Sequence, residues 1–387
     1  MELSEDQKKA LRTILDWEDS VSKRSQYITL GGYAGTGKTT LIAKLRQELK
    51  AKKNKQRVAF ASYTGKAARV LKNKLTEVGV MEKDDSVGTI HSLIYSPIVN
   101  DKKEIAGWKR KDEIEADLIV IDEASMVDGD IWRDLAGYGK PIVAVGDHGQ
   151  LPPIRGSFNL MEKPMLRLEE IHRQAKGNPI IEISMMARME GRIEPKNYGV
   201  GVVKMDKREP EAQERVEEIL RAYDRETLIL CGYNNTRIRL NGFIREARGF
   251  ETPEPGVADR VICLRNNHQV GIYNGMLGTI TQIYKKNEEW YEAGIELDGE
   301  KDEYEGLILA KQFNAVSGLN FGDQRKVTLK GDLFDFGYAL TVHKAQGSQA
   351  KRVVLFEERF GKMSEDEWRR WLYTGVTRAG EELLIVG

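Results

Sequence analysis

The chain lacks most of the features that mark a membrane protein or a disulfide-rich secreted protein. Its 387 residues include only two cysteines, Cys231 and Cys263, which are too few for a disulfide framework or a four-cysteine zinc site. Both lie in apolar runs, which predicts buried, reduced thiols. No apolar run is long enough to span a bilayer, and the acidic start Met1–Asp6 is unlike a signal peptide. We therefore expect a cytosolic enzyme, in a bacterial or phage-infected host cell, with no membrane partner.

The chain also lacks an excess of charge of either sign. Sixty lysines and arginines offset 60 aspartates and glutamates, so net charge argues neither for nor against a polyanionic partner. A nucleic-acid site would have to be a local basic groove. The length predicts about two or three domains, and a 40% hydrophobic content is enough for sizeable cores.

A glycine-rich window near the N-terminus has the form of a phosphate-binding loop. Residues 32–39 read Gly-Tyr-Ala-Gly-Thr-Gly-Lys-Thr, between an expected strand at Tyr27–Leu30 and a helix-forming run at Thr39–Ala51. Glycines let successive backbone N–H groups turn toward a phosphate, and the helix adds its positive N-terminal end. Lys38 can then reach the β- and γ-phosphates, and the Thr39 hydroxyl can ligate Mg²⁺.

This window predicts ATP and Mg²⁺ as cofactors. A chance glycine turn before an ordinary helix is the alternative. The expected nucleotide-binding residues are Gly35, Thr36, Gly37, Lys38, Thr39 and Thr40.

Two carboxylates follow an apolar strand, as expected of the partner of a phosphate loop. Leu118–Ile121 is followed by Asp122 and Glu123. The first can hold Mg²⁺, and the second can orient and deprotonate the water that attacks the γ-phosphate. The alternative is that the two acids only cap the next helix.

Three more residues are candidates for the phosphoryl-transfer chemistry. Gln150 lies in the turn Gly146–Pro153, where it could sense the γ-phosphate or the attacking water; an ordinary turn is the alternative. An arginine opposite the loop can supply roughly 10³–10⁵ in rate. Arg173 and Arg378 are the candidates because each lies in a recognisable motif, whereas a single arginine is usually only a surface charge.

The order of elements predicts an α/β fold. Apolar strands that alternate with amphipathic helices are typical of a parallel sheet covered on both faces. The strands expected in the first half are Tyr27–Leu30, Val58–Ala61, Leu118–Ile121 and Ile142–Val145, with helices after the first two. A second α/β unit is expected to open at Thr227–Leu230 and to resume at Val353–Phe356 and Leu383–Val386.

Two segments interrupt this pattern. Residues 96–116 are polar and basic with a lone Trp108, which predicts a hairpin-like insertion; a solvated loop is the alternative. From Gly271 to about Lys330, short apolar and polar residues alternate between frequent Asn-Gly and glycine turns. That pattern predicts a small β-barrel inserted into the second unit.

Together these signatures resemble one family, the superfamily 1 helicases, specifically the RecD-like and Dda-like branch called 1B. The matching segments in chain order are Gly32–Thr40 (motif I), Ala61–Ala68 (Ia), Gly88–Leu93 (Ib), Asp122–Ser125 (II), Gly146–Pro153 (III), Ile171–Gln174 (IV), Leu340–Gly347 (V) and Tyr373–Ala379 (VI). The resemblance spans nearly the whole chain. It departs at Ala345, where the family often has serine, and at Gly375, where alanine is common. The chain looks like a compact, phage-type member without a long N-terminal extension.

The resemblance implies two RecA-like parallel-sheet domains with ATP between them and two small insertions. The expected boundaries are 1–95 with 117–175 for domain 1A, 176–264 with 331–387 for domain 2A, 96–116 for a pin-like hairpin and 265–330 for an SH3-like β-barrel. It also implies that Gln7 reads the adenine and that Gly347 lies near the nucleotide. Arg378 would reach ATP across the interdomain cleft and couple hydrolysis to domain closure.

The same motifs supply a predicted track for single-stranded DNA. Small or flat polar groups and lysines can bind phosphates or sugars without reading base edges. The residues are Thr64, Lys66, His91, Thr341, His343 and Lys344; each taken singly is more often a helix cap or a surface residue. An aromatic side chain at the pin tip could stack on a base for roughly 1–3 kcal/mol. Trp108 is the candidate, and a structural tryptophan is the alternative.

The leading hypothesis is an ATP-dependent DNA helicase that moves 5′ to 3′ on single strands, with the polarity implied by the family branch. A small-molecule phosphate-loop kinase is one alternative, but it leaves the second α/β unit unexplained. A passive nucleic-acid-binding module is another, but it would not need Glu123, Gln150 and two arginines. The expected partners are single-stranded DNA and single-strand/duplex junctions, with a single-strand-binding protein or a replisome component as further candidates. We expect a monomer.

Overall fold

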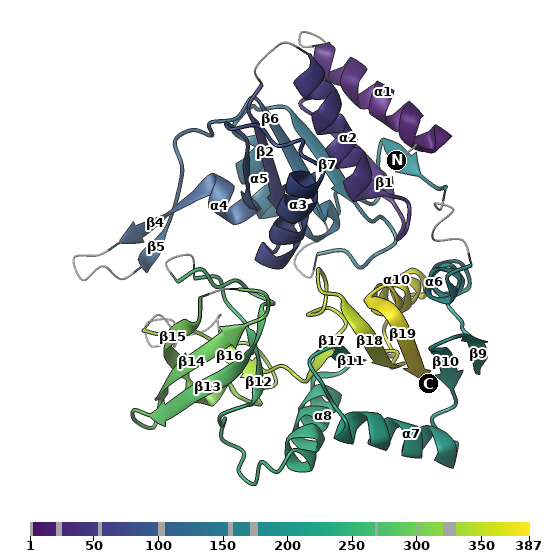
Figure 1. The fold of residues 1–387 in the computed structure, drawn as a ribbon, viewed down its shortest axis with the longest axis vertical. Coiled ribbons are helices and arrows are strands. Elements are labelled where there is room, and N and C mark those ends of the chain that lie inside the picture. Colours follow the sequence, from purple (N-terminus) through teal and green to yellow (C-terminus); the bar gives the residue numbers. More distant parts are fainter. Residues whose placement is uncertain are drawn as a thin grey trace. The chain divides into compact units, whose positions relative to one another are not determined.

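The structure is a computed structural model that describes residues 3–20, 25–52, 56–99, 105–153, 158–170, 177–267, 270–300, 302–319 and 330–387. The chain divides into two compact units, Met1–Ile181 (unit 1) and Glu182–Gly387 (unit 2), whose elements are labelled in Figure 1. This division falls six residues after the expected domain boundary at residue 175, which remains a prediction. None of the described helices is both long enough and apolar enough to cross a membrane.

Unit 1 is built on a fully parallel six-stranded sheet in the order β3-β2-β6-β7-β1-β8. The strands are β1 (Tyr27–Gly32), β2 (Val58–Ser62), β3 (Ser86–Thr89), β6 (Leu118–Asp122), β7 (Ile142–Gly146) and β8 (Leu166–Leu168). The four expected strands are confirmed, because their continuous apolar runs suit strands that are buried on both faces. The edge strands β3 and β8 were not expected.

Helices cover both faces of this sheet. The helices are α1 (Glu5–Asp19), α2 (Lys38–Ala51) and α3 (Gly65–Glu77) on one face, and α4 (Ile90–Ile94) and α5 (Gly129–Ala136) on the other. A hydrophobic core lies on each face of the sheet, and successive residues of β6 point to opposite cores. Val120 packs in the core under α1, α2 and α3, and Ile121 packs in the core under α4 and α5. After β6 the chain makes a short 3-10 turn, η1 (Ala124–Met126).

A two-stranded antiparallel sheet follows α4 directly. Its strands are β4 (Tyr95–Val99) and β5 (Ile105–Arg110), and Tyr95 pairs with Arg110 and Pro97 with Trp108. The strands project from the α4 end of unit 1 (Figure 1). The turn between them lies outside the described residues. The strands lie in the segment expected to form a hairpin-like insertion, whose role as a pin remains a prediction.

Unit 2 contains a second six-stranded sheet, in the order β17-β11-β18-β19-β10-β9. The strands are β9 (Lys196–Gly199), β10 (Val202–Met205), β11 (Thr227–Cys231), β17 (Ala339–Thr341), β18 (Ala350–Phe356) and β19 (Ala379–Val386). All neighbours are parallel except β9 and β10. The sheet takes in residues 196–205, so this unit starts well before the expected opening strand at Thr227.

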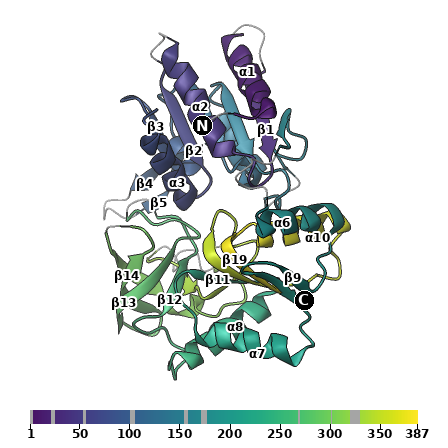
Figure 2. The same cartoon turned by 45° about the vertical axis from the view of Figure 1, so that its right-hand side comes forward.

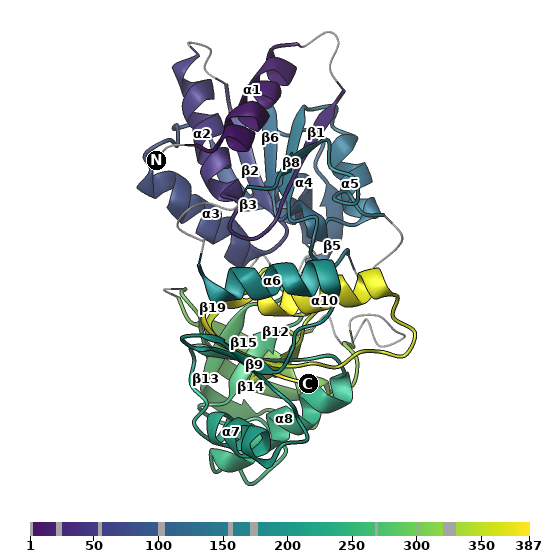
Figure 3. The ribbon, with the colours of Figure 1, turned by 90° about the vertical axis from the view of Figure 1, so that its right-hand side faces the viewer.

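Helices flank this second sheet as well. Figure 2 shows α6 (Pro179–Glu190) and α10 (Glu365–Val376) on one side and α7 (Pro210–Arg221) and α8 (Asn234–Ala247) on the other. Figure 3 shows α6 and α10 side by side. Arg188 pairs with Asp366 at 3.0 Å, and the Trp368 indole donates to the Gly191 carbonyl at 2.7 Å, so the two helices form one layer.

Unit 2 also holds a five-stranded antiparallel sheet in the order β15-β14-β13-β12-β16. The strands are β12 (Arg260–Cys263), β13 (Leu277–Lys285), β14 (Trp290–Leu297), β15 (Tyr304–Leu309) and β16 (Phe334–Phe336), and the 3-10 turn η3 (Ala310–Gln312) follows β15. β12 and β16 lie just outside the expected range 265–330, and the bounds of that insertion remain a prediction. Its description as an SH3-like barrel remains a prediction.

Both cysteines are buried free thiols, as predicted. Cys231 ends β11 and Cys263 ends β12. Burial raises the pKa of the Cys263 thiol to about 12, and it raises the pKa of Cys231 as well, so neither is poised as a nucleophile.

Candidate functional site

The predicted phosphate loop joins β1 to α2 and has the backbone form that the glycines allow. Gly35 and Gly37 have φ of 78° and 75°, a left-handed conformation that L side chains rarely adopt. A Cβ at Gly32 would lie 2.6 Å from the Thr36 hydroxyl, so this position also needs glycine. α2 begins at Lys38 with no side-chain cap, which leaves its N-terminal end to the loop.

The Lys38 ammonium lies over the loop. Its Nζ donates to the carbonyls of Gly32 at 2.8 Å and Tyr33 at 3.0 Å. The Asp147 carboxylate lies 3.8 Å from the same nitrogen. The lysine is thus held at the place where a phosphate cradled by the loop would meet it.

Asp147 connects the loop to the turn after β7, and the sequence analysis did not single it out. One carboxylate oxygen accepts from the Gly149 N–H at 2.9 Å, and the other accepts from the Gln150 amide at 3.2 Å. Asp147 is 1% exposed and Gln150 6%. Asp147 therefore brings the predicted sensor Gln150 into one network with Lys38. The only signal for it in the sequence was its place inside the matched segment Gly146–Pro153.

Asp122 and Glu123 lie at the end of β6, at the same edge of the sheet as the phosphate loop. Burial, and then the neighbouring Glu123 carboxylate, raise the pKa of Asp122, whereas the Lys38 charge lowers it. Glu123 has φ of 57°, and its Oε2 has no hydrogen-bond partner among the described residues. A crowded pair of acids, one with an unsatisfied buried oxygen, is a donor set that suits a bound cation and a water.

These residues fit Mg²⁺ in the arrangement predicted from the sequence. Within the described ranges, no group of three or more His, Cys, Asp or Glu side chains forms a metal cluster. The protein would therefore contribute Thr39 and Asp122, and the nucleotide phosphates and waters would supply the remaining oxygens, as Mg²⁺ commonly requires.

Gln7 supports the loop from α1. Its amide nitrogen donates to the Thr36 carbonyl at 2.9 Å, and its amide oxygen accepts from the Ser4 N–H at 3.0 Å. The side chain is fully buried. On the loop itself, the Tyr33 ring lies 4.2 Å from the His148 ring, centroid to centroid, a contact that the sequence analysis also missed. The reading of adenine by Gln7 remains a prediction.

The predicted DNA contacts of unit 1 lie at helix starts. Thr64 caps α3, and its hydroxyl accepts from the Ala67 N–H at 3.3 Å; Lys66 follows in the first turn. His91 lies in α4, with its ring 4.6 Å from the rings of both Tyr95 and Trp108. The helix cap that was the alternative is thus present at Thr64, and the DNA contacts of all three residues remain predictions.

Trp108 is not at the tip of the hairpin, contrary to the proposal that made it the tip aromatic. It lies within β5, opposite Pro97, and the ladder continues beyond it to the pair Val99 and Ile105. Its indole meets the His91 ring edge-on at 87°. Its packing on His91 agrees with the structural alternative for this tryptophan, and the tip itself lies outside the described residues.

The predicted contacts of unit 2 lie where β17 ends. The Thr341 hydroxyl accepts from the Lys344 N–H at 3.4 Å. Burial lowers the pKa of His343. Burial, and then the nearby Arg237 charge, lower the pKa of Lys344 to about 8, against the effect of Asp335. Thr341, His343 and the Lys344 ammonium, whose pKa is lowered, thus lie in one short loop.

Arg378 is anchored within unit 2. Its guanidinium donates to the carbonyls of Thr374 at 3.0 Å and Ser348 at 3.2 Å and to the Thr377 hydroxyl at 3.2 Å. Gly347 has φ of 75°, which suits glycine. The other predicted arginine, Arg173, lies outside the described residues together with the rest of motif IV.

Packing explains one departure from the family pattern. A Cβ at Gly375 would lie 3.0 Å from both Leu355 methyl groups and 3.5 Å from Val342. α10 thus approaches β18 more closely than an alanine would comfortably allow. The other departure, Ala345, is fully buried, and nothing in the structure explains the loss of a hydroxyl there.

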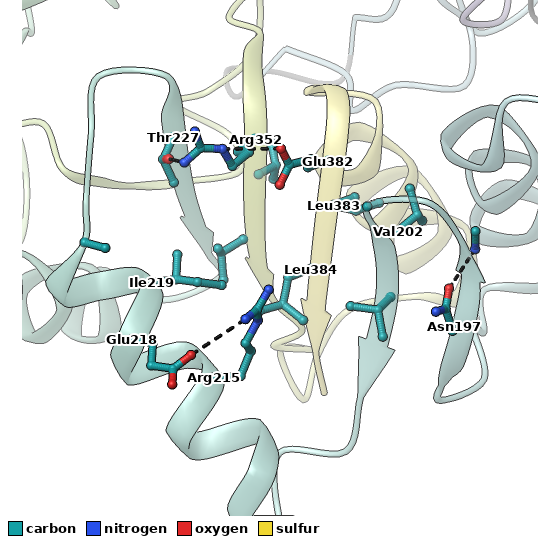
Figure 4. A pocket seen from close by; sticks show the side chains of 16 residues that line it. Asn197, Val202, Arg215, Glu218, Ile219, Thr227, Arg352, Glu382, Leu383 and Leu384 are labelled. Atoms are coloured by element: carbon teal, nitrogen blue, oxygen red, sulfur yellow. Dashed lines mark hydrogen bonds and ion pairs between the residues drawn. The ribbon is translucent and has the colours of Figure 1, made fainter.

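The structure brings together two sets of predicted residues, each within its own unit. Unit 1 gathers the loop, the acidic pair and Gln150; unit 2 gathers motif V and Arg378. A cavity of about 600 Å³ in unit 2 lies between α7 and its sheet (Figure 4), and none of the predicted site residues lines it. The predicted nucleotide-binding residues therefore lie at the strand-end edge of unit 1 and not at this cavity.

Comparison with known proteins identifies the family. Residues 2–198 match the family model described as an AAA domain, and residues 336–386 match the UvrD-like helicase C-terminal domain. The chain belongs to this AAA-domain family, and the match of its C-terminal segment and the names of its relatives support the resemblance to RecD-like helicases.

Named relatives of this RecD-like chain agree. It is 26% identical over 388 residues to the ATP-dependent RecD2 DNA helicase of Deinococcus radiodurans, covering 93% of this chain and 47% of that protein. It is 25% identical over 414 residues to the RecBCD enzyme subunit RecD of Mycobacterium tuberculosis, covering 94% and 67%. The chain spans about half of RecD2, and only 32% of a matching conjugal transfer protein TraA from Rhizobium radiobacter.

Solved structures show the same fold. A crystal structure of Pif1 helicase from Bacteroides in complex with ADP-AlF3 and ssDNA matches with a TM-score of 0.58 at 18% identity, covering 100% of this chain and 92% of that one. Pif1 helicase from Candida albicans matches with a TM-score of 0.51. The predicted fold class, two RecA-like domains in an α/β protein, is confirmed.

Proposed function

We propose that this RecD-like chain is an ATP-dependent DNA helicase that moves 5′ to 3′ on single strands and unwinds duplex DNA. The observation that carries the proposal is the network in unit 1 in which Asp147 joins Lys38 to Gln150, beside the acidic end of β6. The name of the RecD2 relative and the ssDNA in the Pif1 structure support DNA as the substrate.

The predicted site residues of unit 1 each have a role in this proposal. Thr39 and Asp122 would hold Mg²⁺, which when bound neutralises charge on the phosphate oxygens. Lys38 contacts the β- and γ-phosphates. Glu123 orients the attacking water and takes its proton at the free Oε2, and Gln150 senses the γ-phosphate. Gln7 fixes the loop and is positioned to read the adenine.

Conversion of hydrolysis into movement needs both units. Arg173 and Arg378 are the proposed arginines that stabilise charge developing on the γ-phosphate, and Gly347 is proposed to lie near the nucleotide. The polynucleotide would run over residues that bind phosphate or sugar rather than base edges. These residues are Thr64, Lys66, His91, Thr341, His343 and Lys344. Alternate gripping by the two units would then move the strand.

Stimulation of ATP hydrolysis by single-stranded DNA tests the proposal. We expect strong stimulation by oligonucleotides of mixed sequence, because contacts to the backbone do not depend on base identity. A small-molecule kinase would show no stimulation, and a passive DNA-binding module would show no turnover at all. Hydrolysis that is indifferent to DNA would therefore refute the helicase proposal.

A further inference from the structure

The β4–β5 hairpin is fixed at its base to the helix that carries a predicted DNA contact. Tyr95 is both the C-cap of α4 and the first residue of β4, so the strand continues the helix without a linker. The His91 ring, one turn back in α4, lies 4.6 Å from the Tyr95 ring and 4.6 Å from the Trp108 ring of β5. One imidazole therefore contacts an aromatic ring from each strand.

Hydrogen bonds fasten the end of β5 to the same helix. The Lys111 N–H donates to the Ile94 carbonyl at 2.9 Å, and its ammonium donates to the Ser92 carbonyl at 2.7 Å. The Tyr138 hydroxyl bridges the carbonyls of Ile94 and Lys111 at 2.9 and 2.8 Å. The chain directly after β5 is thus attached to α4, so we expect it to move together with that helix.

A cation–π contact and a hydrogen bond also connect the hairpin base to α5 and to the residues that follow it. The Arg110 guanidinium lies 4.3 Å from the centroid of the Tyr138 ring. A Cβ at Gly137 would lie 2.7 Å from an Arg110 nitrogen, so glycine makes room for this contact. The Tyr95 hydroxyl donates to Asp134 of α5. The hairpin base is therefore held on two sides.

A two-stranded sheet needs such support. An isolated hairpin is marginally stable in water, and here Pro97, opposite Trp108, has no N–H to give to the ladder. The direction in which the hairpin points must therefore come from its base. Two ring pairs among the described residues join the hairpin to His91 of the predicted DNA track, Tyr95 from β4 and Trp108 from β5. The pair with Trp108 meets edge-on, a geometry favourable for aromatic rings, and it is the pair that involves the second strand.

We propose that Trp108 is a positioning residue that couples the DNA contact at His91 to the orientation of the hairpin. The inference rests on the proposed helicase function, in which the hairpin separates the strands. When the bound single-stranded DNA presses on His91, the imidazole of His91 moves against the indole of Trp108, and β5 moves with the indole. Trp108 itself touches neither ATP nor the track strand.

The test compares hydrolysis with strand separation in the full chain. Trp108→Ala should leave ssDNA affinity and ssDNA-stimulated hydrolysis within about twofold, while base pairs opened per ATP at a fork fall by about tenfold, a size typical of a lost coupling contact. Trp108→Phe keeps a ring beside His91 and should recover most of the coupling. Trp17→Ala is the matched control, because this indole of unit 1 donates to the Ser25 carbonyl, away from the hairpin, and should leave the ratio unchanged.

Substitution of His91 separates stacking from DNA contact. His91→Phe keeps an aromatic ring on which the bound strand can still press and which still packs against Trp108, but it loses the polar group. DNA affinity should therefore fall while base pairs opened per ATP are retained. His91→Ala should lose both. If His91→Phe uncouples hydrolysis from unwinding as fully as His91→Ala does, the ring contact is not the link and the proposal is wrong.

Other outcomes also decide the question. An unchanged number of base pairs per ATP in Trp108→Ala overturns the proposal, and so does an equal fall in hydrolysis and unwinding, which would place Trp108 in the DNA grip itself. Thermal melting of each variant sets an assay temperature at which all are folded. If the natural chain hydrolyses ATP on ssDNA but opens no fork, the helicase proposal fails, and the coupling proposal fails with it; a normal helicase with an insensitive Trp108→Ala variant refutes the coupling alone.

Discussion

Glu123 has a backbone conformation that a glutamate adopts only at a cost. Its φ of 57° lies in the left-handed region, which costs of order 1–3 kcal/mol for such a residue. The conformation follows directly after β6 and leaves the buried Oε2 without a partner among the described residues. A strained position with an unsatisfied carboxylate oxygen supports the proposed role of Glu123 as the group that accepts a proton from water.

Glu123→Gln therefore should separate binding from turnover. The amide keeps the shape of the side chain but cannot take the proton, so we expect turnover to fall by about 10²- to 10⁴-fold. Affinity for ATP and for single-stranded DNA should stay close to that of the natural chain. Steady-state hydrolysis and equilibrium binding of a fluorescent nucleotide measure the two. Rapid hydrolysis by this variant would contradict the role of Glu123 as the base.

Lys38→Ala should abolish hydrolysis by removing the cation above the phosphate loop. Loss of one preorganised charge at a phosphoryl-transfer site costs about 10²- to 10³-fold or more in rate. Lys44→Ala is the matched control, because Lys44 lies on the same helix and its ammonium pairs with Gln47 at the surface. Near-normal hydrolysis by Lys38→Ala would show that the loop is not the nucleotide site.

As a proposed DNA contact, Lys344 should make DNA binding depend on pH in a predictable direction. Burial lowers the pKa of its ammonium to about 8, so the free protein loses this charge as the pH rises through 8. A bound phosphate favours the charged form, and binding must therefore weaken between pH 7 and pH 9. We expect a loss of up to about tenfold in affinity over this range.

Lys344→Arg is the control for this dependence. A guanidinium stays charged throughout the range, so its affinity should be nearly constant from pH 7 to pH 9 in fluorescence anisotropy titrations at fixed salt. His343 does not confuse the result, because burial lowers the pKa of that imidazole and it is neutral over the whole interval. Equal pH profiles for the two proteins would exclude Lys344 from the DNA contact.

Among the elements, the long buried strands were predictable and the short edge strands were not. β1, β2, β6 and β7 are rich in apolar residues, whereas the four-residue strands β3 and β9 carry no hydrophobic pattern, and β9 is mostly exposed. The phosphate loop was predictable because its glycines must adopt special backbone angles. Asp147 and the place of Trp108 were not, since they depend on which loops meet at a sheet edge and on strand register.

A buried ion pair links two elements of unit 2 that the sequence analysis assigned to one domain. Arg237 of α8 and Asp335 of β16 pair at 2.8 Å, and both are at most 2% exposed. The arginine also donates to the Ala315 carbonyl at 2.8 Å. This contact joins the helical layer to the five-stranded sheet.

Arg237→Met should destabilise unit 2 strongly because it leaves Asp335 buried without its counter-charge. Loss of one partner of a buried pair typically costs about 3–5 kcal/mol. Arg221→Met removes an exposed pair with Glu217 four residues away on α7 and should cost about 0.5 kcal/mol or less. Urea denaturation followed by circular dichroism measures both. Similar losses in the two variants would show that the buried contact is not what holds the sheet to the helices.

At the scale of the whole molecule, the catalytic residues of the phosphate loop and the arginine of motif VI belong to different units. Arg378 is held by three hydrogen bonds inside unit 2, so its geometry is set before any nucleotide binds. In the proposal, such a preformed arginine can reach the nucleotide only when the whole of unit 2 moves toward it. Hydrolysis in this proposal is thus tied to domain closure, and domain closure to movement on DNA.

Directional movement is the property that this arrangement must produce, and it is tested with tailed duplexes. Identical duplexes with a 5′ single-stranded tail, a 3′ tail or no tail present the same base pairs but different loading strands. Since the family branch implies 5′ to 3′ movement, the 5′-tailed duplex should be opened at least about tenfold faster than the others. A tenfold difference in rate corresponds to about 1.36 kcal/mol in the activation barrier. Strand separation is measured with a fluorophore and quencher pair, and Glu123→Gln is the negative control for ATP-driven opening. Faster opening of the 3′-tailed duplex would reverse the assigned polarity, because the same contacts on motifs Ia and V would then have to release in the opposite order during each ATP cycle.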